Sequence, residues 1–168
     1  MASASAADSS QHFDATIGLG SNIGDKVHNI GRAISLLTNG GEVRLVAQSR
    51  LYRSQPWGVE DQDWFVNAVI AVATELSPRQ LLERCQRVEN AMRRVRLKKW
   101  GPRIIDVDIL TYRDQRVAEA NLTIPHPFIA QRAFVLVPLR DVAPDIMVGG
   151  KSIADMIGSV DVSVVEPI

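Results

Sequence analysis

The spacing of apolar residues predicts a strand and a helix at the start of the chain. Residues 14–19 form a short, mostly apolar run that is typical of a strand. Apolar side chains then recur at helical spacing from Val27 to Leu37. Two glycines follow at positions 40 and 41, and because glycine adopts the left-handed conformation that ends many helices, we expect this helix to stop there.

Two strands and a second helix are predicted next. Residues 42–53 alternate apolar and polar side chains, as a half-buried strand does, whereas residues 65–74 are apolar on both faces, as a central strand is. Ser77 and Gln80 have the spacing of a capping box, with a proline at the first helical position between them. The buried side of this helix is predicted to contain Leu81, Leu82, Cys85, Val88 and Met92.

A further strand over residues 104–110 completes a recognisable order of elements. Strand, helix, strand, strand, helix, strand predicts an α+β fold with a ferredoxin-like βαββαβ core, an antiparallel sheet that carries helices on one face. A C-terminal helical and hairpin extension is expected to follow. It comprises a small hairpin near residues 114–116, a helix over residues 128–144 that Pro138 disturbs, and a short last helix within residues 149–158.

Length and composition predict one globular domain. The chain has 168 residues, 46% of them hydrophobic, and we expect a single domain over residues 14–168 after a disordered tail over residues 1–13. The longest apolar run, residues 133–139, is far below the roughly 18 residues of a membrane span. The only cysteine, Cys85, falls among the predicted core positions. A cytoplasmic monomer without a membrane or nucleic-acid partner is therefore expected.

Positive charge is concentrated in one segment, although the formal net charge is zero. Residues 79–103 contain nine of the 19 lysines and arginines but only two acidic residues, Glu83 and Glu89. A solvated helix face followed by a basic loop would account for any single arginine in this segment. The cluster as a whole indicates an anionic partner.

Two aspartates interrupt the apolar strand that follows the basic segment. Asp106 and Asp108 are two residues apart, so they share one face of the strand at a spacing of roughly 7 Å, while their apolar neighbours share the other face. Two adjacent carboxylates repel each other unless a cation neutralises them. A pair that leaves coordination positions to water and substrate phosphates suits Mg²⁺. The alternative is a strand-edge pair bonded to backbone amides or neighbouring arginines.

The glycines near the start and His126 are less informative by themselves. In the run GLGSNIG the third glycine comes one residue too late for a dinucleotide-binding loop, so Gly18 and Gly20 are expected to be close-packing positions at the edge of a site. His126 is held between two prolines in a rigid segment. Either a structural or a ligand-binding role is open for this histidine.

Four motifs occur together in a characteristic order. They are GLGSNIGD, YRSQPWG followed by QDWFVNAV, RVRLKKWGPRIIDVDIL, and LTIPHPFIAQRAFVLVPL. Over residues 14–148 the chain thereby resembles the 6-hydroxymethyl-7,8-dihydropterin pyrophosphokinase family of folate biosynthesis. The resemblance implies a ferredoxin-like core and transfer of the terminal pyrophosphoryl unit of ATP to the pterin hydroxymethyl oxygen, with release of AMP.

The same resemblance implies roles for individual residues. Asp106 and Asp108 correspond to ligands of two Mg²⁺ ions that bind with ATP, and the implied catalytic residues are Arg94, Arg103, Asp108 and His126. ATP binding is implied for Gln86, Glu89, Arg94, Arg96, Arg103, Ile109, Thr123, His126 and Arg132. Pterin binding is implied for Ser54, Gln55, Trp57, Phe65, Asn67 and Phe134. In this set Asn67 pairs with the polar edge of the ring, and the two phenylalanines stack on its faces.

The chain departs from the family pattern at two positions. Arg93 stands where the family usually has glycine, and Gln55 stands where proline is frequent. The segment between Glu89 and Trp100 is also about one residue shorter than in some family members, so the roles of Lys98 and Lys99 are open. Residues 50–63 and 92–101 are predicted to be loops that close over ATP and pterin.

Three other functions compete with this interpretation. Ferredoxin-like sheets bind RNA, but the aromatic, glycine-rich strand signature of such modules is absent. Metal-dependent glycosyltransferases use an Asp-x-Asp pair, but this chain is short for their folds. A pterin-binding protein without activity is the third, and substitution of the two aspartates would distinguish it from an enzyme.

Overall fold

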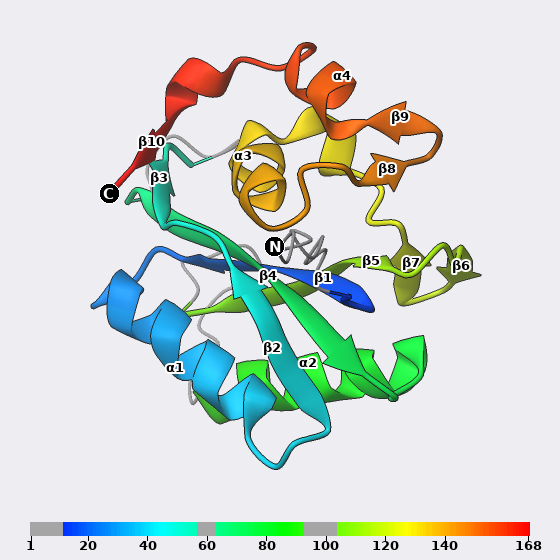
Figure 1. Cartoon of the computed structure of the whole chain (residues 1–168). Helices are drawn as coiled ribbons and strands as arrows, with labels where there is room; N and C mark the ends of the chain where they lie inside the picture. The colour runs from blue at the N-terminus through cyan, green and yellow to red at the C-terminus, as the bar shows by residue number, and fades with distance from the viewer. Residues whose placement is uncertain (1–11, 57–62, 93–103) are drawn as a thin grey trace, which may run out of the picture.

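An antiparallel sheet forms the centre of the protein. The computed structural model describes residues 12–56, 63–92 and 104–168 (Figure 1). Within them the strand order is β10-β3-β4-β1-β5, and β2 also pairs with β4. These strands are β1 (Ala15–Ser21), β2 (Val43–Gln48), β3 (Tyr52–Ser54), β4 (Phe65–Thr74), β5 (Asp106–Tyr112) and β10 (Val165–Pro167). The mixed α/β architecture with an antiparallel sheet agrees with the sequence prediction.

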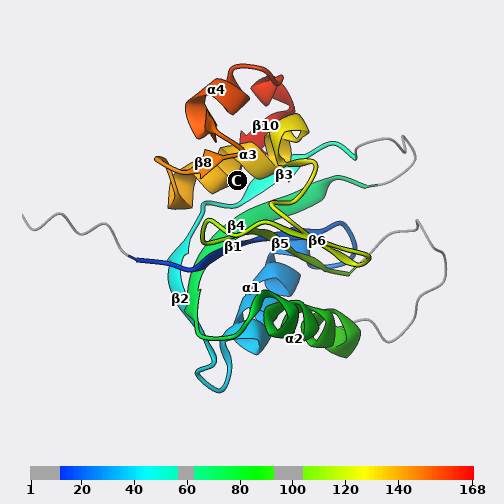
Figure 2. The ribbon, with the colours of Figure 1, turned by 90° about the vertical axis from the view of Figure 1, so that its right-hand side faces the viewer.

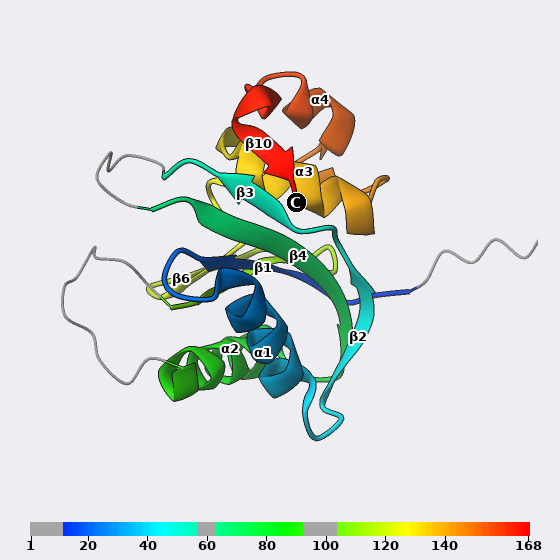
Figure 3. The same cartoon turned by 90° about the vertical axis from the view of Figure 1, so that its left-hand side faces the viewer.

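Helices cover both faces of the sheet, as the side views show (Figures 2 and 3). The helices α1 (Lys26–Thr38) and α2 (Pro78–Met92) lie against one face. The helix α3 (Ala133–Val142) lies against the other, with α4 (Ile153–Ile157) packed on it. The sequence predicted helices on one face only. This holds for α1 and α2, whereas the C-terminal helices cover the other face and form a third layer.

The strand β4 explains why two helical layers are needed. Its residues Val66, Ile70 and Val72 are buried in the cluster under α1 and α2, whereas Val69 is buried in the cluster under α3. Because both faces of the strand are apolar, each face must be covered to be removed from water. The prediction of a central strand from this segment is confirmed.

Both long helices begin and end where the sequence indicates. The Ser77 hydroxyl accepts a hydrogen bond from the Gln80 amide (3.2 Å), and the Gln80 side chain accepts one from the Ser77 amide (2.9 Å), so the capping box is confirmed. The glycines after α1, at positions 40 and 41, have φ angles of 91° and 83°. Val27, the first residue of the helical spacing, is 47% exposed, since it lies in the first turn of α1, ahead of the buried residues that start at Ile30.

Two of the predicted elements are interrupted in the structure. The predicted strand 42–53 is two strands, because the Ser49 hydroxyl accepts the Val69 amide hydrogen (2.9 Å) and ends the regular pairing of β2 with β4. The predicted helix 128–144 contains a 3₁₀ turn (Ile129–Gln131) and then α3. The break falls at Arg132, which is extended with φ −118° and ψ 100°, and not at Pro138, which lies inside α3.

The C-terminal extension consists of short elements around α3. Two hairpins pair β6 (Val117–Glu119) with β7 (Leu122–Ile124) and β8 (Met147–Val148) with β9 (Lys151–Ser152), and a 3₁₀ turn (Val162–Val164) precedes β10. The short last helix is thus confirmed as α4. The small hairpin is also present, but it turns at positions 120 and 121, a few residues after the predicted place near 114–116. Of the expected tail, residues 1–11 lie outside the described residues, while Phe13 packs against the cluster under α3.

Cys85 is a core residue. It is 1% exposed within the cluster under α1 and α2, and burial raises the pKa of its thiol, with further contributions from the negative charges of Glu89 and Asp108. A thiol with a raised pKa is a poor nucleophile at neutral pH. In the part of the chain that the structure describes, no helix has the length and apolar character that crossing a membrane requires.

Candidate active site

Asp106 and Asp108 share the face of β5 that is opposite to α1 and α2. Their neighbours Ile105, Val107 and Ile109 are at most 5% exposed and belong to the cluster under these two helices. Asp106 is half-buried, and Asp108 is exposed. The alternation predicted for this strand is confirmed, so two carboxylates stand side by side on one surface of the sheet.

Each of these aspartates lies opposite a glycine of β1. Gly20 is in register with Asp106, and Gly18 is in register with Asp108. A Cβ atom at Gly20 would come within 3.3 Å of Asn67 Oδ1, and one at Gly18 would come within 3.4 Å of the Leu110 side chain. The glycines therefore leave β1 without side chains beside the carboxylates, as expected for close-packing positions at the edge of a site.

The outer edge of β5 is held by α2. The Val107 amide, between the two aspartates, donates a hydrogen bond of 2.9 Å to Glu89 Oε1. Because β5 ends the strand order of the described sheet, this amide has no neighbouring strand on that side, and the glutamate supplies the acceptor. Ile109, one of the predicted nucleotide-binding residues, directs its side chain into the core, so that only its main chain can meet a ligand.

Arg132 faces the aspartates from the segment before α3. Its guanidinium carbon lies 5.0 Å from the centre of the Phe128 ring and 5.6 Å from that of Phe134. Burial lowers the pKa of Arg132, and the negative charges of Asp108 and Asp106 oppose that shift. The guanidinium is therefore within electrostatic reach of both carboxylates.

His126 is fixed beside β5 in one orientation. Its backbone amide donates to the Leu110 carbonyl (2.8 Å), and its Nδ1 accepts a hydrogen bond from the Phe128 amide (3.2 Å). An imidazole that accepts at Nδ1 carries its proton on Nε2, which is then available as a donor. Burial, and secondarily the positive charge of Arg132, lower the pKa of His126 and favour this neutral form.

A buried amide lies on the other side of Gly20. Asn67 of β4 is 5% exposed, and its Nδ2 donates a 2.6 Å hydrogen bond to the hydroxyl of Ser54, which is 3% exposed. This contact sets the orientation of the amide. Phe65 of β4 and Phe134 of α3, the two expected stacking rings, are both half-buried. The structure thus brings four predicted pterin-binding residues to the α3 side of the sheet.

The remaining predicted site residues are either exposed on the surface or outside the described part of the chain. Gln55, Gln86 and Thr123 are exposed. Trp57, Arg94, Arg96 and Arg103 lie outside the described residues, as do Lys98 and Lys99 and, within the two predicted loops, residues 57–62 and 93–101. The described part of the first predicted loop contains the strand β3, so that part of the loop prediction is wrong. Phe128, which stacks on Arg132, was not among the predicted residues, although its position directly after the PHP motif could have indicated it.

The donor set at the carboxylate pair is small. Within residues 12–56, 63–92 and 104–168, no group of three or more His, Cys, Asp or Glu side chains is arranged to hold a metal ion. Asp106 and Asp108 could hold a cation from this face of β5, with its other coordination positions left to water or a bound molecule.

A separate hollow of about 740 Å³ lies at the other end of β5. Its walls come from the segment before β1, the turn after β5 and the β8–β9 hairpin, and include Phe13, Arg113 and Met147. No described residue of the predicted site lines this hollow. It is thus distinct from the surface that carries the aspartate pair.

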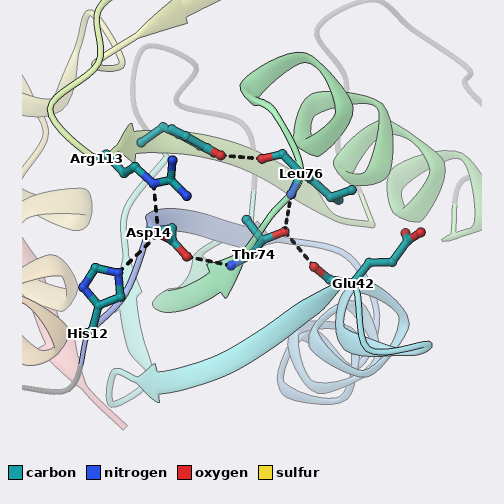
Figure 4. A network of polar contacts seen from close by, with 7 residues as sticks. His12, Asp14, Glu42, Thr74, Leu76 and Arg113 are labelled. Carbon is teal, nitrogen blue, oxygen red and sulfur yellow. Dashed lines mark hydrogen bonds and ion pairs between the residues drawn. The ribbon is translucent and has the colours of Figure 1, made fainter.

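A polar network closes the sheet beside this hollow (Figure 4). Asp14 accepts hydrogen bonds from the Thr74 amide (2.8 Å) and from Arg113 Nε (3.0 Å), and His12 Nε2 lies 3.4 Å from it. Burial acts to raise the pKa of Asp14, but the hydrogen bonds from Thr74 and Arg113 and the nearby positive charge outweigh it, so the pKa lies below its usual value. The carboxylate therefore joins the start of β1 to the ends of β4 and β5.

The fold and the site define a mixed α/β protein whose antiparallel sheet carries a carboxylate pair facing a cationic and aromatic wall. Residues 16–144 match the model of the family described as 7,8-dihydro-6-hydroxymethylpterin-pyrophosphokinase (HPPK). The chain therefore belongs to this family. The family expected from the four sequence motifs is confirmed.

Two curated relatives carry the same name, 2-amino-4-hydroxy-6-hydroxymethyldihydropteridine pyrophosphokinase. The protein of Methylorubrum extorquens is 47% identical over 152 residues, which cover 90% of this chain and 96% of the relative. The protein of Haemophilus influenzae is 42% identical over 139 residues, which cover 83% of this chain and 87% of the relative. Both relatives are thus matched over nearly their whole length.

Solved structures share the fold. A crystal structure of HPPK-DHPS in complex with substrates aligns with a TM-score of 0.71 and a sequence identity of 13%. The crystal structure of wild-type Plasmodium falciparum HPPK-DHPS with SDX-DHP aligns with a TM-score of 0.70 and a sequence identity of 16%. Each alignment covers 88% of this chain but only 43% and 44% of the respective structure's chain. This chain therefore spans less than half of those proteins, and the likeness concerns the fold alone.

Proposed function

We propose that this protein transfers the terminal pyrophosphoryl group of ATP to the hydroxymethyl group of 6-hydroxymethyl-7,8-dihydropterin, giving AMP and the pterin diphosphate, in folate biosynthesis. The observation that carries the proposal is the pair Asp106 and Asp108 on one face of β5, separated only by glycine positions from the buried amide of Asn67. Membership in the HPPK family and the shared name of the two relatives support the same activity.

The two aspartates would hold the Mg²⁺ ions that accompany ATP, two in number by resemblance to the family. Asp106 and Asp108 provide carboxylate oxygens and leave the other coordination positions to water and phosphate oxygens, which is the donor set that Mg²⁺ prefers. When bound, Mg²⁺ would neutralise phosphate charge and orient the triphosphate. In the free protein Arg132 offsets part of the charge of the carboxylate pair.

Positively charged and hydrogen-bonding groups would grip the triphosphate from the opposite wall. Arg132 offers a guanidinium held between two aromatic rings, and His126 offers an Nε2 donor. Because charge on the transferred group is spread over its oxygens, such donors stabilise the transition state by position and electrostatics. The proposal also includes Arg94, Arg96 and Arg103, and, on the nucleotide side, Gln86, Glu89, Ile109 and Thr123.

The pterin would lie between Asn67 and the aspartates. Asn67 and Asp106 are on strands two positions apart, about 10 Å by strand spacing, with Gly20 between them, which leaves room for a flat bicyclic ring. Asn67 would pair with the polar edge, and Phe65 and Phe134 would stack on the faces. The main chain of Ser54, Gln55 and Trp57 completes this proposed pocket.

The chemical step follows from this placement. The pterin hydroxyl oxygen forms a bond to the β-phosphorus of ATP while the bond from that phosphorus to the α,β-bridging oxygen breaks, and AMP leaves. Asp108 is the residue we assign to accept the hydroxyl proton. Positioning of the two reactants by Asp108, His126, Arg94 and Arg103 is expected to supply most of the acceleration.

The proposal also covers the topology of the core, the domain organisation, the oligomeric state and the location of the protein. We assign the elements β1, α1, β2 with β3, β4, α2 and β5 to a ferredoxin-like βαββαβ core within one domain over residues 14–168. The element order, and the position of β1 between β4 and β5, support this assignment. We further propose that the protein acts as a monomer in the cytoplasm.

Phosphorus NMR tests the activity directly. The protein is incubated with Mg²⁺, ATP and 6-hydroxymethyl-7,8-dihydropterin, and AMP with a pterin diphosphate should appear only when pterin is present. Asp106→Asn and Asp108→Asn should abolish both signals, whereas Asp114→Asn, in the exposed turn after β5, should not. Formation of ADP would show that a single phosphoryl group is transferred and would contradict the proposal.

A pterin-binding protein without activity is the competing function. Binding measured by pterin fluorescence separates the two, because the aspartate variants of an enzyme should keep pterin affinity while losing turnover. If the unmodified protein binds pterin tightly but makes no AMP under any Mg²⁺ concentration, the binding function replaces the enzymatic one.

A further inference from the structure

The C-terminal strand β10 completes the sheet next to the predicted pterin end of the site. It pairs with β3 in the register Val165 with Ser54, Glu166 with Arg53, and Pro167 with Tyr52. The Ile168 amide adds a hydrogen bond to the Leu51 carbonyl (3.1 Å). The family match ends at residue 144, so this strand lies beyond the part of the chain that the match covers.

On the α3 side of the sheet, β10 packs under the residues that would bind pterin. Val165 is 8% exposed and shares a cluster with Tyr52, Ala133 and Val137, and Phe134 packs against this cluster. Val165 therefore contacts the same apolar surface as the proposed stacking ring. It is also in register with Ser54, whose hydroxyl orients the Asn67 amide.

On the opposite face, Glu166 orients the Arg53 side chain of β3 toward the residue before β4. Its Oε2 accepts hydrogen bonds from Arg53 Nε (2.9 Å) and Nη2 (2.6 Å), and the Arg53 guanidinium carbon lies 5.0 Å from the centre of the Trp64 ring. Trp64 directly precedes Phe65, the other proposed stacking ring. One chain of contacts thus runs from Glu166 through Arg53 to the start of β4.

We propose that β10 positions the pterin end of the site, with Glu166 and Val165 as its positioning residues. This inference rests on the proposed function. The strand β3 has three residues, with β4 on one side and β10 on the other, so removal of β10 turns it into a short edge strand. The Ser54 hydroxyl and the Asn67 amide would then lose their fixed geometry.

The ATP end should be less sensitive to the same change. The aspartates lie on β5, three strand positions from β3, or about 14 Å by strand spacing. No element between them belongs to the C-terminal segment. The inference therefore predicts a selective loss of pterin affinity, which general loosening of the fold would not produce.

The test measures both affinities on the full chain and on charge variants. Pterin affinity is measured by fluorescence with Mg²⁺ and α,β-methylene-ATP, whose modified bridge blocks transfer, and the affinity for this analogue is measured separately. Because the ion pair is half-exposed, Glu166→Arg should raise the pterin Kd by about three- to fivefold and leave the analogue Kd unchanged. Combining it with Arg53→Glu should restore pterin affinity, and Glu75→Gln, an exposed glutamate after β4, is the neutral control.

A chain that ends at Asp161 extends the test to the whole strand. If its circular dichroism matches that of the full chain, its pterin Kd should rise by about tenfold or more. The analogue Kd should change less, because the ATP end meets this cluster through Arg132, whose guanidinium carbon lies 5.6 Å from the centre of the Phe134 ring. If the shortened chain does not fold, the charge variants decide alone.

The inference is overturned if Glu166→Arg leaves the pterin Kd unchanged, if it raises both Kd values equally, or if the double variant fails to restore affinity. Turnover by the full chain is recorded in parallel. Absence of AMP formation there would count against the proposed function, whereas normal turnover with unaffected variants would count only against the role of β10.

Discussion

Asn67 and Asp106 lie opposite the same residue, Gly20, on its two neighbouring strands. A glycine at this place keeps the surface between an amide and a carboxylate open, and a Cβ atom there would approach Asn67 Oδ1 to 3.3 Å. The relationship joins the proposed pterin end and the proposed metal end of the site in one cross-strand row. It also makes the site sensitive to a single methyl group.

Gly20→Ala should weaken pterin binding by about tenfold, because an added methyl group in a packed position costs about 1 kcal/mol or more and here displaces the Asn67 amide. The affinity for α,β-methylene-ATP should not change. Fluorescence titration measures both. Gly31→Ala is the matched control, since a Cβ atom there meets nothing within 4 Å and alanine favours the helix α1. Equal pterin affinity in Gly20→Ala and the unmodified protein would contradict the proposed position of the ring.

Glu89→Leu should destabilise the protein by about 1–2 kcal/mol, because the Val107 amide loses the acceptor that α2 supplies. Urea unfolding followed by circular dichroism gives this free energy. Glu83→Leu, at an exposed position of the same helix, should have little effect and serves as the control. A destabilisation of the same size in both variants would mean that the hydrogen bond to β5 is not the cause.

Asp14→Asn should lower the free energy of unfolding at pH 7 by about 1–2 kcal/mol, because the ion pair with Arg113 is lost. The pKa of Asp14 is lower in the folded than in the unfolded protein, where it is about 3.9, so its stabilisation is complete above that value and is lost as the pH falls through the folded pKa. The difference between variant and unmodified protein should therefore shrink in acid. Urea unfolding between pH 7 and pH 3 measures it, with Asp114→Asn as the exposed control. A difference that stays constant over this range would contradict the assignment.

The His126 imidazole should titrate with a pKa below about 6.5 in the free protein, because burial and Arg132 disfavour its charged form. Its contribution to stability is then present above the unfolded pKa and is lost as the pH falls through the folded one. Bound triphosphate should raise this pKa, since an anion favours the imidazolium. NMR titration with and without Mg²⁺ and α,β-methylene-ATP measures both values, and His126→Gln identifies the resonance. No change on adding the nucleotide would place His126 away from the phosphates.

Local patterns were sufficient for most elements of this fold. The capping box at Ser77, the glycine end of α1 and the apolar faces of β4 depend on residues close together in sequence, and each is found as predicted. The break at Ser49 was missed because its hydroxyl binds the amide of Val69, a residue on another strand. The extended Arg132 was missed as well, since the helical spacing of apolar residues continues through it. The third layer formed by α3 could not be derived from the order of elements alone.

The features of the candidate site also divide into those that the sequence determined and those that only the tertiary structure decided. The sequence by itself determined that Asp106 and Asp108 share a face, since the period of a strand is a local property. Only the tertiary structure decided that Gly18 and Gly20 lie opposite them, that Ser54 orients Asn67, and that β10 supports β3, because strand register and hydrogen-bond partners depend on which distant segments are brought together. The chemistry of each residue type was therefore evident from the chain, whereas its geometry came from the pairing of β1, β4 and β5.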